Sequence, residues 1–426
     1  MSAGPDRGGT AIGAGNCAGA VSLINARLVL PHRVEDAGWL ELAGGQIVGL
    51  GRGQDHDHAG VVIDVDGAYV LPGLIDVHND GLEFEVNPRP GTNLPLAMAF
   101  ANFERQALGA GVTTVFHALS FTDRPDLSRS VSSAWERAEF IQEHQQCRPV
   151  DHQVLHRFDV WSPATLEPIF ESMARLPVRY VSLNDHTPGQ GQYRDFAKHL
   201  ERLAAYRQRR LTGEVDPDEL RRRMEERQRA VAGGWLNAVY RDVAARRAQL
   251  PCVIGTHDDD TPEKVEAQAA IGATIAEFPV TLEAARQARR LGMAIVVGAP
   301  NIVRGGSHSG NLSAIDLVTE GLADIICADY HAPSLLPAVF RLVDAGVLTL
   351  PQAVAMVTAN PARAIGLQDR GLLAIGRRAD VVVVRREASA PIVEAAFCAG
   401  RLVFTFSGRS VAPRLVGAGR EGPRGS

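Results

Sequence analysis

The middle of the chain alternates short apolar runs with segments of helical spacing. We identify eight such runs, each followed by a helix-compatible segment such as TPEKVEAQAAIG after the fifth run. The runs are GLIDVHND, TTVFHALS, QVLHRFDVW, YVSLNDH, CVIGTHDDD, TIAEFP, AIVVGAP and DIICADYH. This alternation predicts an α/β fold, a (β/α)8 TIM barrel over residues 71–368. A six-stranded doubly wound sheet is the alternative, but no G-x-G-x-x-G motif follows the first strand.

The two ends of the chain share a different pattern, in which short β-branched runs are broken by Gly and Asp. Residues 20–70 contain VSLINARLVL, WLELAGGQIVGLG and VVIDVDGAYV, and residues 369–412 contain RRADVVVVRR, PIVEAAFCAG and RLVFTFSG. Such runs are typical of β-hairpins. Neither end alone makes a sheet with a core, so we predict a small β-sandwich domain formed by both chain termini.

One connection between strands is unusually long. Residues 193–250, between the fourth and fifth strands, are rich in Arg and Glu and show helical spacing in FAKHLERLAAY and ELRRRMEERQRAV. The pattern predicts a helical insertion of solvated amphipathic helices on the barrel exterior. A lid or an oligomer contact is the alternative use of this insertion. We expect the chain to form a homo-oligomer, in the form of a dimer.

Composition and charge narrow the class of function. The formal net charge of −5 argues against a non-specific nucleic-acid-binding protein. No run of eighteen apolar residues is present, so no membrane span is expected. The five cysteines are scattered without C-x-x-C spacing, and the first twenty residues lack the apolar core and basic start of a secretory signal. We therefore expect a cytoplasmic enzyme that acts on a small molecule.

Several strand ends carry His or Asp side chains where (β/α)8 barrels place catalytic groups. His78 and Asp80 are two residues apart, so both are expected to face the barrel mouth. His186, His257 and Asp329 lie at the ends of the fourth, fifth and eighth runs. Imidazoles and carboxylates gathered in one place need a cation to organise them, and such ligands suit zinc, manganese or iron. We therefore predict a site for one or two divalent metal ions, with zinc as the first choice.

These residues resemble the motifs of the amidohydrolase superfamily. LPGLIDVHND resembles its first-strand motif, with Asp80 at the second ligand position, and RGLLAIGRRADVVVV resembles its return to the β-domain. The resemblance implies a metal-bearing barrel flanked by a β-sandwich, with His78, Asp80, His186 and His257 as ligands. It also implies that Asp329 is the last-strand carboxylate, which binds metal and shuttles the proton.

The resemblance also raises the question of a bridge between two metal ions, for which many members of the superfamily use a carboxylated lysine. This chain has only two lysines, Lys198 and Lys264, and both fall in predicted helices beyond the strand ends. A bridge must then be a carboxylate, and Asp159 in LHRFDVW is the candidate. Three histidines remain as competing ligands: His117, His152 and His156.

Longer motifs resemble one branch of the superfamily. HNDGLEFEVNPRPG, GAGVTTVFHAL, NDHTPGQGQY, THDDDTPEKV, EFPVTLEAA, GAPNIVRGGSHSGN and TANPARAIGL are similar to the alpha-D-ribose 1-methylphosphonate 5-triphosphate diphosphatases of phosphonate catabolism. The resemblance implies hydrolysis of a triphosphate to a 5-phosphate and diphosphate. The chain departs from that pattern at His117, Asp159 and Gly81, where the branch is expected to have Asp, Glu and Asn.

A phosphorylated substrate agrees with the loop RGGSHSGN, which offers backbone amides, hydroxyls, an imidazole and a guanidinium for binding an anion. An ordinary strand-to-helix connection is the alternative interpretation of this loop. Arg89, between two prolines, is a second candidate cation, and an exposed surface arginine is its alternative. The predicted substrate-binding residues are Arg89, Arg304, Ser307, His308, Ser309 and Asn311.

The expected mechanism is metal-assisted attack of water at the α-phosphorus. In it, Asp329 accepts the proton and Arg304 stabilises the diphosphate leaving group. Two other functions remain open at this point. One is a C–N hydrolase of the same superfamily, a cyclic amidase or deaminase. The other is a catalytically silent barrel that serves as an assembly component.

Overall fold

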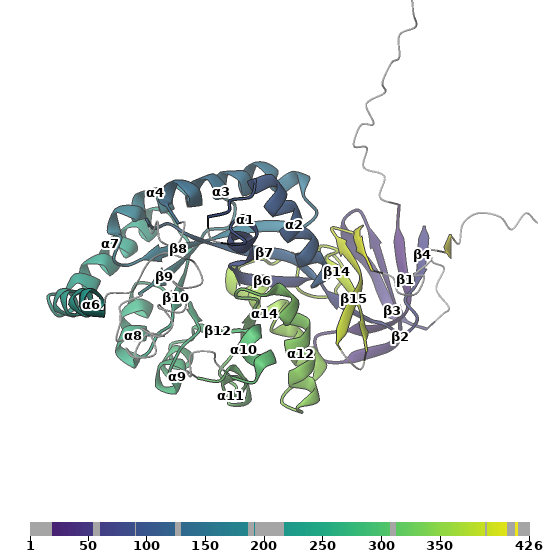
Figure 1. The fold of residues 1–426 in the computed structure, drawn as a ribbon. Helices are drawn as coiled ribbons and strands as arrows, with labels where there is room; N and C mark the ends of the chain where they lie inside the picture. The colour runs from purple at the N-terminus through teal and green to yellow at the C-terminus, as the bar shows by residue number, and fades with distance from the viewer. Residues whose placement is uncertain are drawn as a thin grey trace, which may run out of the picture.

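The computed structural model describes residues 19–53, 60–89, 91–123, 129–185, 191, 217–306, 312–387, 390–406 and 414–415. These residues form two sheets, which lie side by side in Figure 1. One is an eight-stranded parallel sheet in the order in which its strands occur in the chain. Its strands are β6 (Leu74–Asn79), β7 (Val112–Ser120), β8 (Asp151–Asp159), β9 (Tyr180–Asn184), β10 (Val253–His257), β11 (Ile275–Glu277), β12 (Ala294–Gly298) and β13 (Ile325–Cys327). The predicted (β/α)8 barrel is confirmed.

The barrel closes where its first strand, β6, meets the end of its last strand, β13. An isolated parallel bridge joins Asn79 to Asp329, and the amide of Asp80 donates to the carbonyl of Asp329 over 2.7 Å. Lower down the same seam, the backbone of Met356 and Val357 accepts hydrogen bonds from β13 and β6. The direct backbone hydrogen bonds that close the described barrel therefore lie near its carboxyl end.

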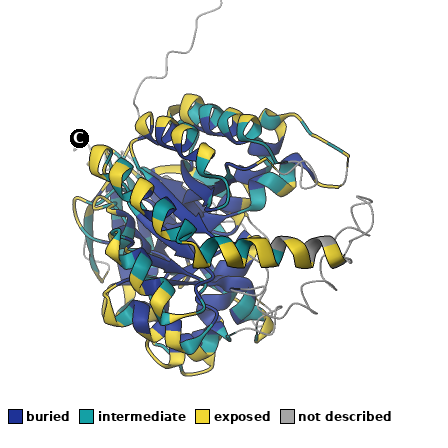
Figure 2. Ribbon diagram, turned by 90° about the vertical axis from the view of Figure 1, so that its left-hand side faces the viewer, coloured by how far each residue is buried: buried dark blue, intermediate teal, exposed yellow. Residues whose placement is uncertain are grey.

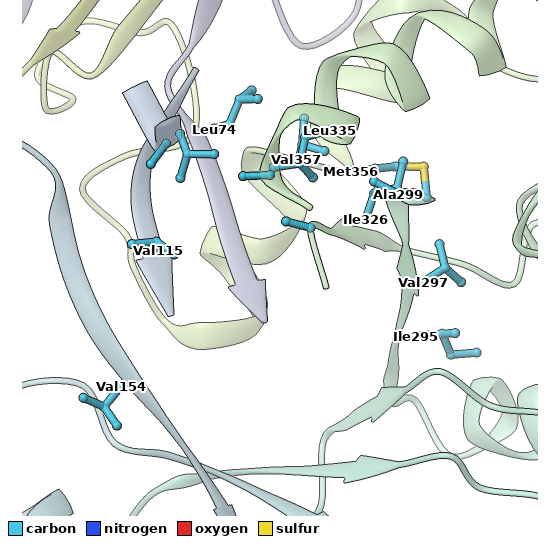
Figure 3. Close-up of a cluster of buried hydrophobic side chains, with 14 of the residues drawn as sticks. Leu74, Val115, Val154, Ile295, Val297, Ala299, Ile326, Leu335, Met356 and Val357 are labelled. Atoms are coloured by element: carbon cyan, nitrogen blue, oxygen red, sulfur yellow. The ribbon is translucent and has the colours of Figure 1, made fainter. Parts of the chain in front are cut away.

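Helices cover the outside of the barrel, and the barrel sheet separates an inner apolar layer from an outer one that lies under the helices. The inner layer contains Leu155 and Tyr180, while Val154 and Phe158 face outward, as the alternation of side chains along a strand requires. Figure 3 shows part of the outer layer. The described helices of six or more residues are α1 (Gly81–Val86), α2 (Leu96–Gly109), α3 (Val131–His144), α4 (Leu166–Ala174), α6 (Pro217–Ala232), α7 (Trp235–Gln249), α8 (Pro262–Ala270), α9 (Leu282–Arg290), α10 (Ala299–Arg304), α11 (Ala314–Thr319), α12 (Leu335–Asp344), α13 (Leu350–Ala355) and α14 (Ala359–Ile365).

The second sheet is built from both ends of the chain, as the sequence predicts. Antiparallel pairing of β5 with β14 joins the two ends, with Val70 opposite Val383. The sheet is branched, because β1 pairs with β2, β4 and β5. Its nine strands are β1 (Val21–Val29), β2 (Val34–Ala43), β3 (Gln46–Arg52), β4 (Val61–Asp64), β5 (Tyr69–Pro72), β14 (Val381–Arg386), β15 (Pro391–Cys398), β16 (Arg401–Thr405) and β17 (Arg414–Leu415).

Two helices, α6 and α7, fall within the insertion predicted between β9 and β10. Residues 192–216 of that insertion lie outside the described residues. Helix α6 lies at the edge of the molecule, and its side chains are largely exposed (Figures 1 and 2). Helix α7 packs against the barrel, because Trp235 stacks on Trp161 and donates to the carbonyl of Val160. The domain boundaries and the extent of the insertion stay predictions.

Among the described residues, no helix combines the length and apolar character that crossing a membrane requires.

Candidate metal and substrate site

Side chains able to bind a metal gather at the carboxyl end of the barrel, around the seam between β6 and β13. The amide of Asp329 donates to the carbonyl of His78 over 3.0 Å, which places the two residues side by side. Asp329 has a φ of 58°, a left-handed conformation that non-glycine residues seldom adopt. Asp80 follows β6 directly, and its Oδ1 lies 4.0 Å from Nε2 of His78.

Two groups of potential ligands overlap at this seam, and both contain His78. In each group the ligand atoms lie within 4.8 Å of one another. One group is His78, Asp80 and Asp329, and the other is His78, His257 and Glu277. The predicted ligands His78, Asp80, His257 and Asp329 are therefore brought together among the described residues.

Glu277 orients His78 by bonding the ring nitrogen that faces away from Asp80. Nδ1 of His78 lies 3.3 Å from Oε2 of Glu277, while Nε2 faces Asp80. Glu277 is fully buried, and it also accepts hydrogen bonds from the hydroxyls of Tyr180 and Ser182. A carboxylate on one ring nitrogen fixes the tautomer and orientation of a histidine that binds metal through the other. Nδ1 of His257 lies 2.9 Å from Oδ2 of Asp258, which repeats the arrangement.

The charges of these groups agree with a cation site. Burial raises the pKa of Asp329 to about 7, and the adjacent Asp80 carboxylate acts in the same direction. Burial would also raise the pKa of Glu277, but the imidazoles of His78 and His257 and the hydroxyl of Tyr180 together outweigh it and lower that pKa to about 2. A divalent cation relieves the repulsion between Asp80 and Asp329, and imidazole and carboxylate donors fit zinc, manganese or iron.

A cavity of about 310 Å³ opens over this group of side chains. Arg304, at the end of α10, lines it together with the metal-binding candidates Asp80, His257 and Asp329. Two exposed aromatic side chains, Phe84 and Tyr330, also line it. The remaining lining residues are Arg157, Asp258, Phe278, Pro279, Val280, Val297, Gly298, Pro300, Asn301, Leu312, Ala314 and Leu317.

Other predicted site residues are placed elsewhere or lie outside the described residues. Asp159 ends β8, where its Oδ1 accepts the amide of Trp161 over 2.9 Å, and it belongs to neither ligand group. Arg89 is exposed in a bridge with Thr92 and is not among the residues that line the cavity. The site residues that lie outside the described residues are His186, Ser307, His308, Ser309 and Asn311.

The three competing histidines are buried under the helices and are not part of either ligand group. On the outer side of β7 and β8, the ring nitrogens of His117 and His152 lie 2.9 Å apart, and His152 contacts Glu104 of α2. His156 contacts the hydroxyl of Ser172 on α4 and the carbonyl of Tyr180. These contacts are structural.

The lysines do not join the ligand groups among the described residues. Lys264 is buried on α8, with Nζ 3.8 Å from Asp185 and 4.0 Å from Asp259. Lys198 lies outside the described residues.

Sequence reasoning missed Glu277 and Arg157. Glu277 is the acidic residue within the run TIAEFP and ends the strand β11, so its position at a strand end was a usable signal. Arg157 lies two residues after the inward-facing Leu155 on β8. This spacing was a usable signal that the side chain of Arg157 also faces inward.

Comparisons with known proteins agree with the fold. The model of the amidohydrolase family matches residues 255–395. The alpha-D-ribose 1-methylphosphonate 5-triphosphate diphosphatase of Escherichia coli (strain K12) is 37% identical over 385 residues, which cover 89% of this chain and 99% of that protein.

Among solved structures, two similar folds are an N-acetyl-D-glucosamine-6-phosphate deacetylase and an enamidase. The deacetylase, from Mycobacterium smegmatis, has a TM-score of 0.60 at 16% identity over 90% of this chain and 100% of its own. The enamidase has a TM-score of 0.57 at 16% identity over 92% of this chain and 97% of its own. With the sequence match across the whole bacterial relative, these findings lead to one conclusion: the chain belongs to the amidohydrolase superfamily and, within it, to the family of the Escherichia coli diphosphatase.

Proposed function

We propose that this protein is a metal-dependent diphosphatase. Its substrate is alpha-D-ribose 1-methylphosphonate 5-triphosphate or a close analogue, which it cleaves to the 5-phosphate and diphosphate in phosphonate catabolism. The observation that carries this proposal is one cavity that contains both the metal-binding candidates and the cation of Arg304. The 37% identity to the Escherichia coli diphosphatase supports the choice of substrate.

The proposed metal ligands are His78, Asp80, His257 and Asp329, with His186 as a further ligand outside the described residues. Zinc is the first choice, and manganese and iron have the same ligand preferences. A bound divalent cation supplies Lewis-acid polarisation of a phosphoryl oxygen and activation of water. A bridging role for Asp159 and the number of ions stay predictions.

In the proposed reaction Asp329 is the general base. Its carboxylate accepts a proton from water as the water oxygen forms a bond to the α-phosphorus. The bond from the α-phosphorus to the bridging oxygen of the diphosphate breaks, and diphosphate leaves with the electron pair. Arg304 binds the leaving diphosphate, because a guanidinium forms two hydrogen bonds with phosphate oxygens. Ser307, His308, Ser309 and Asn311 are proposed to join Arg304, and Arg89 stays a prediction.

The test is phosphorus NMR of the purified, metal-loaded protein mixed with ribose 5-triphosphate bearing a 1-methylphosphonate. Release of diphosphate is the expected result and identifies the bond that is cleaved. Release of single phosphate would reject attack at the α-phosphorus. An unchanged spectrum with metal bound would favour a C–N hydrolase, and one without stoichiometric metal would favour a silent assembly component. The cytoplasmic location and the homodimer stay predictions.

A further inference from the structure

Arg157 is a buried cation at the mouth of the barrel that the proposed mechanism does not yet use. It lies on β8, and its side chain is only 9% exposed. It nevertheless lines the same cavity as His257, Asp329 and Arg304. An arginine stays charged at any depth of burial, so this position carries a permanent positive charge.

The guanidinium of Arg157 is held rigidly from one side. Its Nε and Nη2 donate to Oδ1 of Asn184 over 3.2 and 3.0 Å, and Nη1 donates to Oδ1 of Asp80 over 3.2 Å. Asn184 is fixed in turn, because its Nδ2 donates to the carbonyl of Ser182. A guanidinium has five N–H groups, and these bonds use three of them. Nη1 and Nη2 each have a second N–H, and among the described residues neither of these N–H groups forms a further hydrogen bond.

Asp80 links this guanidinium directly to the metal-binding group. The oxygen that accepts from Arg157 is the same Oδ1 that lies 4.0 Å from Nε2 of His78. Arg157 and the metal-binding candidates Asp80 and Asp329 also line the same cavity. Arg304 stands farther out, since it is an exposed residue at the end of α10. The two arginines thus occupy an inner and an outer position in one cavity.

We propose that Arg157 is a catalytic residue that binds a non-bridging oxygen of the phosphate under attack, while Arg304 binds the phosphates that leave. This inference rests on the proposed function, because it assumes a polyphosphate in the cavity. A fixed, buried donor next to the reacting phosphorus stabilises the charge that develops there, and it does so without reorganising during the reaction. A neutral substrate gives a buried cation at this position no comparable role.

The test measures binding of inorganic pyrophosphate and tripolyphosphate to the metal-loaded protein by titration calorimetry, so it does not depend on turnover. The variants are Arg157→Gln, Arg157→Lys and the control Arg129→Gln. Arg129 forms a two-point ion pair with Glu83 and also lowers the pKa of Asp80, but it does not line the cavity. The control therefore removes a nearby charge without removing a proposed phosphate donor. Metal content is measured on every sample.

Arg157→Gln should bind both anions roughly 10- to 100-fold more weakly, with its metal content unchanged. Arg157→Lys should keep part of the affinity for both anions but lose most of the turnover number. Lysine keeps the positive charge but lacks the paired, planar N–H donors of a guanidinium. Arg129→Gln should bind as the wild type does. If Arg157→Gln fails to fold, the test rests on Arg157→Lys. A catalytic role then requires that this variant lower kcat by a larger factor than it raises KM.

Two results would overturn the inference. Unchanged anion binding in Arg157→Gln would leave Arg157 without a role in binding, even if the wild type releases diphosphate. Loss of metal in both Arg157 variants would show that Arg157 acts by positioning Asp80 rather than by binding phosphate. Failure of the proposed function looks different: the wild type would then release no diphosphate from the ribosyl triphosphate, although Arg157 still governs its affinity for tripolyphosphate.

Discussion

Nδ1 of His78 lies 3.3 Å from the carboxylate of Glu277, so the first strand of the barrel is tied to the sixth through a metal-binding candidate. The pair is buried, and each partner changes the acidity of the other. Burial alone would lower the pKa of His78, but the carboxylate of Glu277 raises it above its ordinary value. The contact therefore fixes the orientation of the imidazole and makes it more basic.

Removing the charge of Glu277 should weaken metal binding. We expect Glu277→Gln to lower metal affinity about 10- to 100-fold, because the partner that orients His78 is weakened. Competition with a chelator followed by elemental analysis gives this affinity. Glu320→Gln is the control, since Glu320 is an exposed carboxylate paired with Arg286 on the barrel exterior. Equal metal affinity in Glu277→Gln and Glu320→Gln would remove Glu277 from the role of orienting His78.

Asp329→Asn should abolish most of the turnover while leaving the fold intact. A general base contributes about 10²- to 10⁴-fold to the rate, and asparagine cannot accept the proton. Steady-state release of diphosphate measures the loss, and circular dichroism checks the fold. Turnover within a few-fold of the wild type would remove Asp329 from the role of base.

The metal-free protein should show the raised pKa of Asp329 in its stability. The folded state holds this proton up to a pKa of about 7, against an ordinary value of 3.8. The stability contributed by the protonated form is therefore complete below pH 3.8 and is lost as the pH rises through 7. Because Asp329 is partly exposed to the cavity, we expect the free energy of unfolding to fall by about 2 kcal/mol, which is less than the whole pKa shift would give.

Denaturant unfolding of metal-free wild type and Asp329→Asn between pH 4 and 7.5 measures this loss. The other titrating groups are common to both proteins, so their difference isolates Asp329. The variant should become the more stable of the two as the pH rises, and saturating metal should reverse the order. Parallel stability curves for the two metal-free proteins would show that Asp329 ionises normally.

Arg304→Ala should distinguish substrates by the number of their phosphates. If Arg304 binds the leaving diphosphate, the KM for the triphosphate should rise about tenfold or more, with little effect on binding of a ribose 5-monophosphate analogue. Arg286→Ala is the control, because Arg286 is an exposed arginine paired with Glu320 on the barrel exterior. Equal losses for the triphosphate and the monophosphate would make Arg304 structural.

Gly81 stands where the branch is expected to have Asn, and the packing around it accounts for the glycine. A Cβ atom at Gly81 would lie 2.7 Å from Oδ1 of Asn79 and 2.9 Å from the ring of Phe103. We expect Gly81→Ala to lower the free energy of unfolding by about 1–3 kcal/mol. In contrast, Gly306→Ala should have little effect, because its added Cβ meets no atom within 4 Å. Urea unfolding measures both, and equal stability of the two variants would contradict this account.

The barrel could be predicted from the sequence because each strand lies in a short apolar run that is followed by a helix-compatible segment. Even β11, only three residues long, is recognisable in TIAEFP. The union of both chain ends in one β-domain was also accessible, since neither end alone makes a sheet with a core, whereas the pairing of β5 with β14 came only from the structure. These features depend on local pattern and on the requirement that apolar faces be buried.

The parts of the site that could not be predicted depend on where individual side chains point. Arg157 and Asp159 share one face of β8, so spacing cannot tell which of them enters the cavity. The turn after β8 decides, because the amide of Trp161 bonds the carboxylate of Asp159. Likewise, the role of Glu277 depends on which ring nitrogen of His78 faces it, and a sequence carries no such information.

The seam of the barrel has a consequence for how the enzyme is made. Asp76 and Ala328 are joined by a hydrogen bond although they are 252 residues apart, and the ligand group at this seam draws His78 and Asp80 from one side and Asp329 from the other. A polypeptide still emerging from the ribosome has only two of the three side chains of this group until its last barrel strand is synthesised. The group is therefore complete only once the barrel closes, and cleavage of the chain between the two edges divides it when the edges separate.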